Sequence, residues 1–322
     1  MQTLHPFSDM SGRADADTAS SSSWRAQPGT VHDRGRRSLL AAVAAGATLA
    51  LPLRALAQAS SAAGGAASVL SPDVLAKRQA EMLQAHPDAV QNVITAFVDG
   101  RKPKAEGLLL DVATLADNPS AVPVRVSVDP SLITESNWCE ELIILAEKNP
   151  IPLACRMYFT PLAGVAEAAV RVRLARSQAI HALARMKDGQ ILEARKDVTV
   201  AASGCGMYGG KTMSTSTPPR IWTSTLTPKK GEMVRVRAQI SHRMETGLRL
   251  DEHGQIKPRD IVTRFEAHLG EGLLYAWEPG PATARNPYIE FTFLARESGE
   301  LRLSWKGDEG FTLEATRTIT VQ

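Results

Sequence analysis

The chain has 322 residues, of which 43% are hydrophobic and 22% charged, and its formal net charge is +3. This length is enough for two domains of ordinary size, and the near-neutral charge excludes a strongly basic surface for nucleic acid or anionic membrane. The chain has only three cysteines, so an exported form would keep at least one thiol unpaired or paired between chains.

Residues 1–57 are predicted to be a twin-arginine signal peptide. Arg36-Arg37 precedes an apolar run from Leu39 to Leu51, and small residues follow at Ala55-Leu56-Ala57. The run is shorter than the roughly 20 helical residues that cross a bilayer, so no membrane span is expected. The polar residues before Arg34 are either an extended leader or the product of a start codon placed too early. Export by this route would place the protein in the periplasm.

Cleavage after Ala57 would leave 265 residues with 31 Lys and Arg against 30 Asp and Glu, a formal charge of +1. A helical segment is predicted near the new N-terminus, where Ser71-Pro72-Asp73 has the composition of an N-terminal cap and Pro87 marks a break. Its apolar residues recur at the spacing of one helical face. They are Leu75, Met82, Leu83, Val90, Val93, Ile94 and Phe97.

After Gly100 the apolar residues recur with a period of two, which is typical of half-buried strands in an antiparallel sandwich. Turn signals at Asn149-Pro150 and Lys187-Asp188-Gly189 separate these strands. The predicted strands are 122–128, 142–146, 153–159, 168–174, 179–186 and 191–200. Together with the helical segment they predict a first domain over residues 70–206, which ends in an arm that carries a cysteine.

A second strand-rich domain is predicted over residues 228–322, after a flexible linker at 207–227 that is rich in Thr, Ser and Pro. Its predicted strands are 233–240, 261–269, 288–293, 299–305 and 311–321. The predicted fold class is therefore mainly β, with two β-sandwich domains and an N-terminal helical segment.

The arm between the two domains is the most informative stretch of the chain, because it places Cys205 among small residues. Glycine has no Cβ and tolerates either sign of φ, so a flexible arm is predicted that presents this thiol. The arm residues are Ser203, Gly204, Gly206, Gly209 and Gly210. The five residues from Ala201 to Cys205 extend about 16 Å at roughly 3.3 Å each, enough to carry the sulfur off the sandwich. The alternative is an ordinary loop with a chance cysteine.

The other two cysteines are expected to be buried and unpaired. A hairpin around Asn149-Pro150 would place Cys155 opposite about Leu145, with Cys139 several residues further along. A disulfide needs Cα atoms within about 7 Å, so this arrangement disfavours one.

No metal or cofactor is expected. His242 and Met244 could join Cys205 as soft copper ligands. However, His-x-Met on a strand only places two side chains on one face and does not fix the position of a third ligand. Asn286-Pro287-Tyr288 and Trp305 are interpreted as turn and core residues. No histidine or carboxylate stands beside Cys205, and the chain has no Cys-x-x-Cys pair, so neither a cysteine hydrolase nor a dithiol oxidoreductase is indicated.

Separate motifs in both domains resemble a known pair of families. The motifs that resemble SoxY, the sulfur-carrying subunit of the periplasmic thiosulfate-oxidising system, are Val122–Asp129, Ala146–Pro150, Phe159–Pro161, Val198–Val200 and Gly204-Cys205-Gly206. The motifs similar to its partner SoxZ are Ile240–Gly247, Ile256–Arg259, Asn286–Tyr288, Glu297–Gly299 and Ser304-Trp305.

The resemblance implies two immunoglobulin-like sandwiches docked within one chain, edge to edge or face to face. It also implies a non-enzymatic carrier that holds sulfur-oxidation intermediates on Cys205 as a cysteine S-thiosulfonate or persulfide. The implied partners are a Sox-type cytochrome, a sulfate thiohydrolase and a sulfane dehydrogenase. This chain departs from the family tail, since Ser203 and Met207 each replace a glycine and a whole domain follows.

Two alternatives stay open at this point. A branch of fused carrier-like proteins is associated with quinoprotein dehydrogenases, so a thiol-bearing binding or assembly module, or one for metal delivery, is the second hypothesis. An exposed Cys205 would also allow a disulfide-linked homodimer.

Overall fold

The computed structural model describes residues 69–201, called the first half below, and residues 217–322, the second half. Two helices begin the first half, α1 (Pro72–Met82) and α2 (Ala89–Val98). The strands of the first half are β1 (Leu108–Asp111), β2 (Leu115–Ala116), β3 (Val122–Val128), β4 (Cys139–Ala146), β5 (Leu153–Phe159), β6 (Glu167–Val172), β7 (Gln178–Met186) and β8 (Ile191–Val200). Those of the second half are β9 (Arg220–Thr223), β10 (Met233–Gln239), β11 (Val262–Leu269), β12 (Gly272–Pro279), β13 (Tyr288–Leu294), β14 (Gly299–Gly307) and β15 (Thr312–Ile319).

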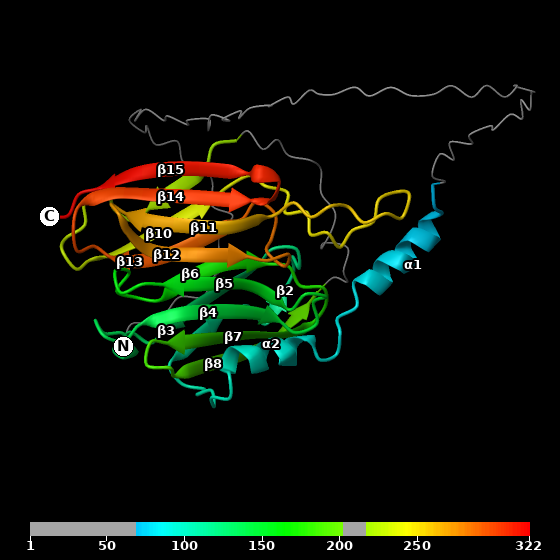
Figure 1. The fold of residues 1–322 in the computed structure, drawn as a ribbon, viewed down its shortest axis with the longest axis horizontal. Coiled ribbons are helices and arrows are strands. Elements are labelled where there is room, and N and C mark those ends of the chain that lie inside the picture. Colours follow the sequence, from blue (N-terminus) through cyan, green and yellow to red (C-terminus); the bar gives the residue numbers. More distant parts are fainter. Residues whose placement is uncertain (1–68, 202–216) are drawn as a thin grey trace, which may run out of the picture. The chain divides into compact units, whose positions relative to one another are not determined.

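These strands form two sheets, and each sheet contains strands from both halves (Figure 1). The nine-stranded sheet has the order β15-β14-β11-β12-β5-β4-β7-β8-β2, and the six-stranded sheet the order β1-β3-β6-β13-β10-β9. The halves meet where β12 pairs with β5 in one sheet and β13 with β6 in the other. We call these two strand pairs the seam. The mainly β fold class is confirmed, and the halves are joined edge to edge.

The core lies between the sheets because alternating side chains of each strand point inward. In β3, for example, the four valines are buried while the residues between them are more exposed. Side chains of both halves meet at the centre of the core, where the Tyr275 ring lies 5.1 Å from that of Phe159 and stacks at 5.1 Å on Phe291. Trp277 and Trp305 are also fully buried.

The seam requires a glycine directly after β12. A Cβ atom on Gly280 would lie 2.9 Å from the carbonyl oxygens of Leu153 and Ala154. The Gly280 amide donates a hydrogen bond to the Ala154 carbonyl at 2.8 Å, so the backbones of the two halves approach closely here.

The helices contact different parts of the fold. Apolar residues of α2 pack on the outer face of the nine-stranded sheet, where Phe97 is buried against a cluster that includes Ile143, Leu183 and Ile191. Helix α1 buries none of its residues. It contacts the second half through Gln79, which donates a hydrogen bond to the Leu248 carbonyl and accepts one from the Leu250 amide. Neither helix, and no other helix in the described ranges, is long and apolar enough to span a membrane.

The predicted strands agree with the observed ones to within a few residues, but four strands were missed. These are β1, β2, β9 and β12. Strand β9 lies inside the range 207–227 that the sequence predicted as a linker, so that end of the range belongs to the six-stranded sheet. It was missed because four residues are too few for an alternating pattern to be recognised. Strand β12 was missed because it is apolar on both faces over most of its length.

Candidate functional site

The thiol that the sequence singles out lies outside the described residues. Cys205 and the predicted arm residues Ser203, Gly204, Gly206, Gly209 and Gly210 fall in 202–216, as the predicted signal peptide falls in 1–68. The structure does describe the strands on either side of 202–216. These are β8, which precedes the segment, and β9, which follows it.

The end of β8 is held firmly up to the last described residue before Cys205. The Val200 amide donates a hydrogen bond to the Ser177 hydroxyl at 2.9 Å, and the Ala201 amide donates one to the Ala116 carbonyl at 3.1 Å. Strand β8 also pairs in parallel with the short β2. The chain therefore enters the segment that contains Cys205 from an anchored backbone.

Strand β9, on the other side of the segment, is an edge strand. It pairs with β10 and has no neighbour on its other side within the described sheet. Strand β8 belongs to the nine-stranded sheet and β9 to the six-stranded sheet. Trp222 on β9 is 48% exposed.

The other two cysteines are buried and unpaired, as predicted. Burial, together with the charge of Glu141, raises the pKa of the Cys139 thiol far above its usual range. Burial also raises the pKa of Cys155, to about 12. Cys155 pairs with Ile144 rather than Leu145, because the register between β4 and β5 shifts at that point. Both thiols stay protonated near neutral pH, and a protonated buried thiol is a poor nucleophile.

His242 and Met244 are buried and have structural contacts. The Met244 backbone has a φ of +50°, and its amide donates a hydrogen bond to His242 Nδ1 at 3.1 Å. The Met244 sulfur accepts a hydrogen bond from the Val262 amide. Burial lowers the pKa of His242 more than the nearby Asp260 carboxylate raises it. These contacts fix the backbone of the loop 240–261 that connects β10 and β11.

An ionic cluster that the sequence analysis did not find lies on the outer face of the six-stranded sheet. Its centre is Glu290 on β13, whose side chain is only 3% exposed. This carboxylate accepts hydrogen bonds from Arg125 at 2.7 Å, Arg237 at 2.8 Å and the Tyr288 hydroxyl at 2.8 Å. Burial alone would raise the pKa of Glu290, but these hydrogen bonds and the charge of Arg125 outweigh burial and lower it.

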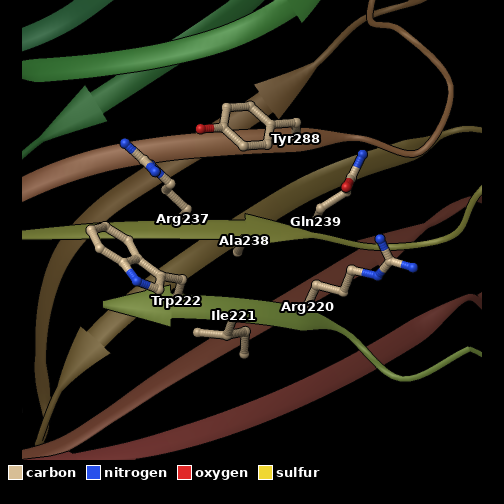
Figure 2. Close-up of a pocket in the computed structure, with 7 residues that line it drawn as sticks. All are labelled: Arg220, Ile221, Trp222, Arg237, Ala238, Gln239 and Tyr288. Atoms are coloured by element: carbon tan, nitrogen blue, oxygen red, sulfur yellow. The ribbon is translucent and has the colours of Figure 1, made fainter. Parts of the chain in front are cut away.

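A shallow pocket of about 170 Å³ opens beside this cluster, between β9, β10 and β13 (Figure 2). Its side walls are Arg220, Trp222, Arg237, Gln239 and Tyr288. Tyr288, interpreted above as a turn or core residue, therefore lines a surface pocket, whereas Trp305 is a core residue. A sequence signal did exist, since alternation places Arg220 and Trp222 on one face of β9 and Arg237 and Gln239 on one face of β10. Only strand pairing brings the two sets together.

Comparisons with known proteins match the two halves to two families. Residues 94–205 match the family model for sulfur oxidation protein SoxY, and residues 224–318 match that for sulphur oxidation protein SoxZ. No curated protein matches the chain.

Two solved structures show a weaker likeness. The chain is similar to the sulfur carrier protein SoxY from Chlorobium limicola f thiosulfatophilum at 17% identity and a TM-score of 0.31, over 36% of this chain and 100% of that one. It is also similar to a superoxide reductase (neelaredoxin) from Ignicoccus hospitalis at 18% identity and a TM-score of 0.27, over 38% of this chain and 97% of that one.

The two family matches identify the chain. SoxY and SoxZ are carrier and partner proteins rather than enzymes, which confirms the expectation of a non-enzymatic protein. The chain is therefore a fusion of a SoxY domain and a SoxZ domain and belongs to the SoxYZ proteins of sulfur oxidation.

Proposed function

We propose that this protein is a periplasmic carrier that holds sulfur-oxidation intermediates covalently on Cys205 while partner enzymes process them. The observation that carries the proposal is the extent of the SoxY match, which runs to residue 205 and so ends on this cysteine. The two other thiols support it by elimination, because both are buried and their pKa values are raised. Cys205 is the remaining thiol of the chain.

Attachment of thiosulfate to Cys205 would be an oxidation. The cysteine thiol and thiosulfate would form one new S–S bond, giving cysteine S-thiosulfonate, and would release one proton and two electrons. A partner cytochrome would accept the electrons.

Release of the oxidised sulfur would be a hydrolysis with no redox change. Water would attack the terminal sulfonate sulfur and break its bond to the sulfane sulfur, leaving sulfate, a proton and a cysteine persulfide on Cys205. A sulfate thiohydrolase partner would catalyse this step, and a sulfane dehydrogenase would oxidise the remaining sulfane. The carrier itself would supply only the thiol.

Proteins of the Sox system are periplasmic in general, which fits the predicted signal peptide. We propose export through the twin-arginine route on the basis of Arg36-Arg37, which would deliver the sandwich already folded.

Intact mass of the mature protein from thiosulfate-grown cells tests the proposal. We expect additions of sulfane, thiosulfonate or sulfonate mass on Cys205, and none in the matched variant Cys205→Ser. An unmodified thiol, or copper bound in its place, would contradict the carrier function and favour an assembly module.

Alkylation of the folded protein provides the control for accessibility. Because Cys139 and Cys155 are 0% and 1% exposed, iodoacetamide should add one label to the native chain and three after denaturation. The folded Cys205→Ser variant should take no label. If it is labelled as readily as the parent protein, one of the buried thiols is reachable and the assignment to Cys205 fails.

A further inference from the structure

The pocket beside β9 has a positive lining. Arg220 and Arg237 both border it, and no carboxylate does. In the neighbouring cluster, Glu290 directs both of its carboxylate oxygens to Arg125, Arg237 and Tyr288. The negative charge of the neighbouring cluster is thus already neutralised, and the field in the pocket favours an anion.

Unused hydrogen-bond donors face the same space. Arg220 is exposed and has no hydrogen bond or ion pair from its side chain to any described residue, nor has the indole nitrogen of Trp222. Gln239 uses one amide hydrogen on the Asn286 carbonyl and keeps the other. Figure 2 shows Trp222 and Arg237 on one side of the pocket and Gln239 and Arg220 on the other, with Tyr288 beside them.

The aromatic walls are held in position by stacked arginines. The Arg237 guanidinium lies 4.5 Å from the centre of the Trp222 ring, and that of Arg171 lies 4.7 Å from the Tyr288 ring. These contacts order the rings without occupying the free donors. The pocket thus combines a charged, donor-rich end with an aromatic surface.

Pocket size limits the ligand. About 170 Å³ is below the roughly 300–1,000 Å³ of sites for drug-sized molecules, so the pocket has the size for a small ion. A guanidinium binds oxyanions through two parallel N–H groups, while a polarisable sulfur makes favourable contacts with aromatic rings. Thiosulfate has both features, three oxygens at one end and a sulfane sulfur at the other.

We propose that this pocket is a non-covalent binding site for a small sulfur oxyanion of the thiosulfate type. The oxygens would bind Arg220 and Gln239, and the sulfane sulfur would lie against Trp222 or Tyr288. The inference rests on the proposed function, in which thiosulfate is attached to Cys205, and adds a separate non-covalent site for that anion. It places a substrate site on the strand that directly follows the segment carrying Cys205.

Titration of the full mature chain with Cys205→Ser tests this binding without any covalent adduct. Sodium thiosulfate, sulfate and acetate would be added in separate calorimetric or NMR titrations at constant ionic strength. We expect saturable binding in the order thiosulfate, sulfate, acetate. Arg220→Gln should weaken thiosulfate binding about tenfold or more, because it removes a charged hydrogen-bond donor. Trp222→Leu should reduce the preference for thiosulfate over sulfate.

Arg302→Gln is the matched control. Arg302 lies on β14 of the other sheet and, like Arg220, has no side-chain partner among the described residues, so its loss should leave the affinity unchanged. The proposal is overturned if thiosulfate binding does not saturate, if acetate binds as tightly, or if both arginine variants weaken binding equally. Since Cys205 is absent from this experiment, its failure is distinct from a failure to find an adduct on that residue.

Discussion

The halves are held together differently on the side of the seam that faces the core, the inner side, and on the side that faces solvent, the outer side. On the inner side, Tyr275 and Trp277 of the second half pack against Phe159 and Met157 of the first, and all four are buried. On the outer side of the six-stranded sheet, Arg125 of the first half binds Glu290 of the second. Apolar burial supplies most of the free energy because it grows with the area removed from water, whereas the charged pairs need a precise geometry and so favour one register over its neighbours.

The same charged cluster connects the seam with the pocket through a series of ion pairs and stacking contacts. Arg125 also bonds Glu167 at 2.5 Å, and Arg235 lies 3.5 Å from Glu167 and 3.4 Å from Glu290. Arg237 then links Glu290 to Trp222 on the edge strand. The outer side of the seam therefore positions pocket residues as well as joining the halves, a role that the inner side does not have.

The inner side should give the largest effect on stability. Trp277→Ala removes a fully buried ring and leaves a cavity, so we expect the free energy of unfolding to fall by about 3–5 kcal/mol. Trp222→Ala, the same change at a ring that is 48% exposed, should cost less than about 1 kcal/mol. Urea unfolding of both variants measures the difference, and equal losses would mean that the inner side does not dominate.

The outer side should give a smaller effect. Glu290→Gln leaves Arg125 and Arg237 without their shared carboxylate, and we expect a loss of about 2–3 kcal/mol, reduced by the partial exposure of the arginines. Glu266→Gln, which breaks a more exposed pair with Arg264, should cost less than about 1 kcal/mol. A Glu290 variant as stable as the Glu266 variant would show that the cluster adds little.

Acid should also weaken the outer side of the seam, with the smallest effect of the three. The folded-state pKa of Glu290 lies below its ordinary value of 4.5, so the unfolded chain binds this proton first as the pH falls. The stabilisation is complete above about pH 4.5 and is lost below it. Unfolding curves from pH 7 to pH 3 should fall less steeply for Glu290→Gln than for the parent protein. Parallel curves would exclude a contribution from this group.

Local patterns in the sequence predict much of the fold. The alternation in Val122–Val128 identifies β3 and its buried face, and similar runs identify most of the longer strands. Strand β12 escapes this approach because leucine, tyrosine, alanine and tryptophan follow one another without a polar face. Cys205 could be chosen as the reactive thiol from its glycine-rich neighbours, and it remains a prediction.

The pocket could not be predicted in this way. Arg220, Gln239 and Tyr288 are far apart in the sequence, and each by itself resembles an ordinary outward-facing strand residue. They become one surface because β9, β10 and β13 are neighbours in the sheet. The same holds for Arg125 and Glu290, which belong to different halves of the chain.

The sequence by itself determined the mainly β class, most of the longer strands and the two buried cysteines. The physical reason is that the face on which a strand residue lies depends on a period of two, which neighbouring residues already express. Only the tertiary structure decided that both sheets continue across the seam, and that the charged cluster and the pocket form on their outer face. Strand pairing depends on contacts between segments that are far apart in the sequence. The alternating patterns of these segments are too similar to show which strand pairs with which.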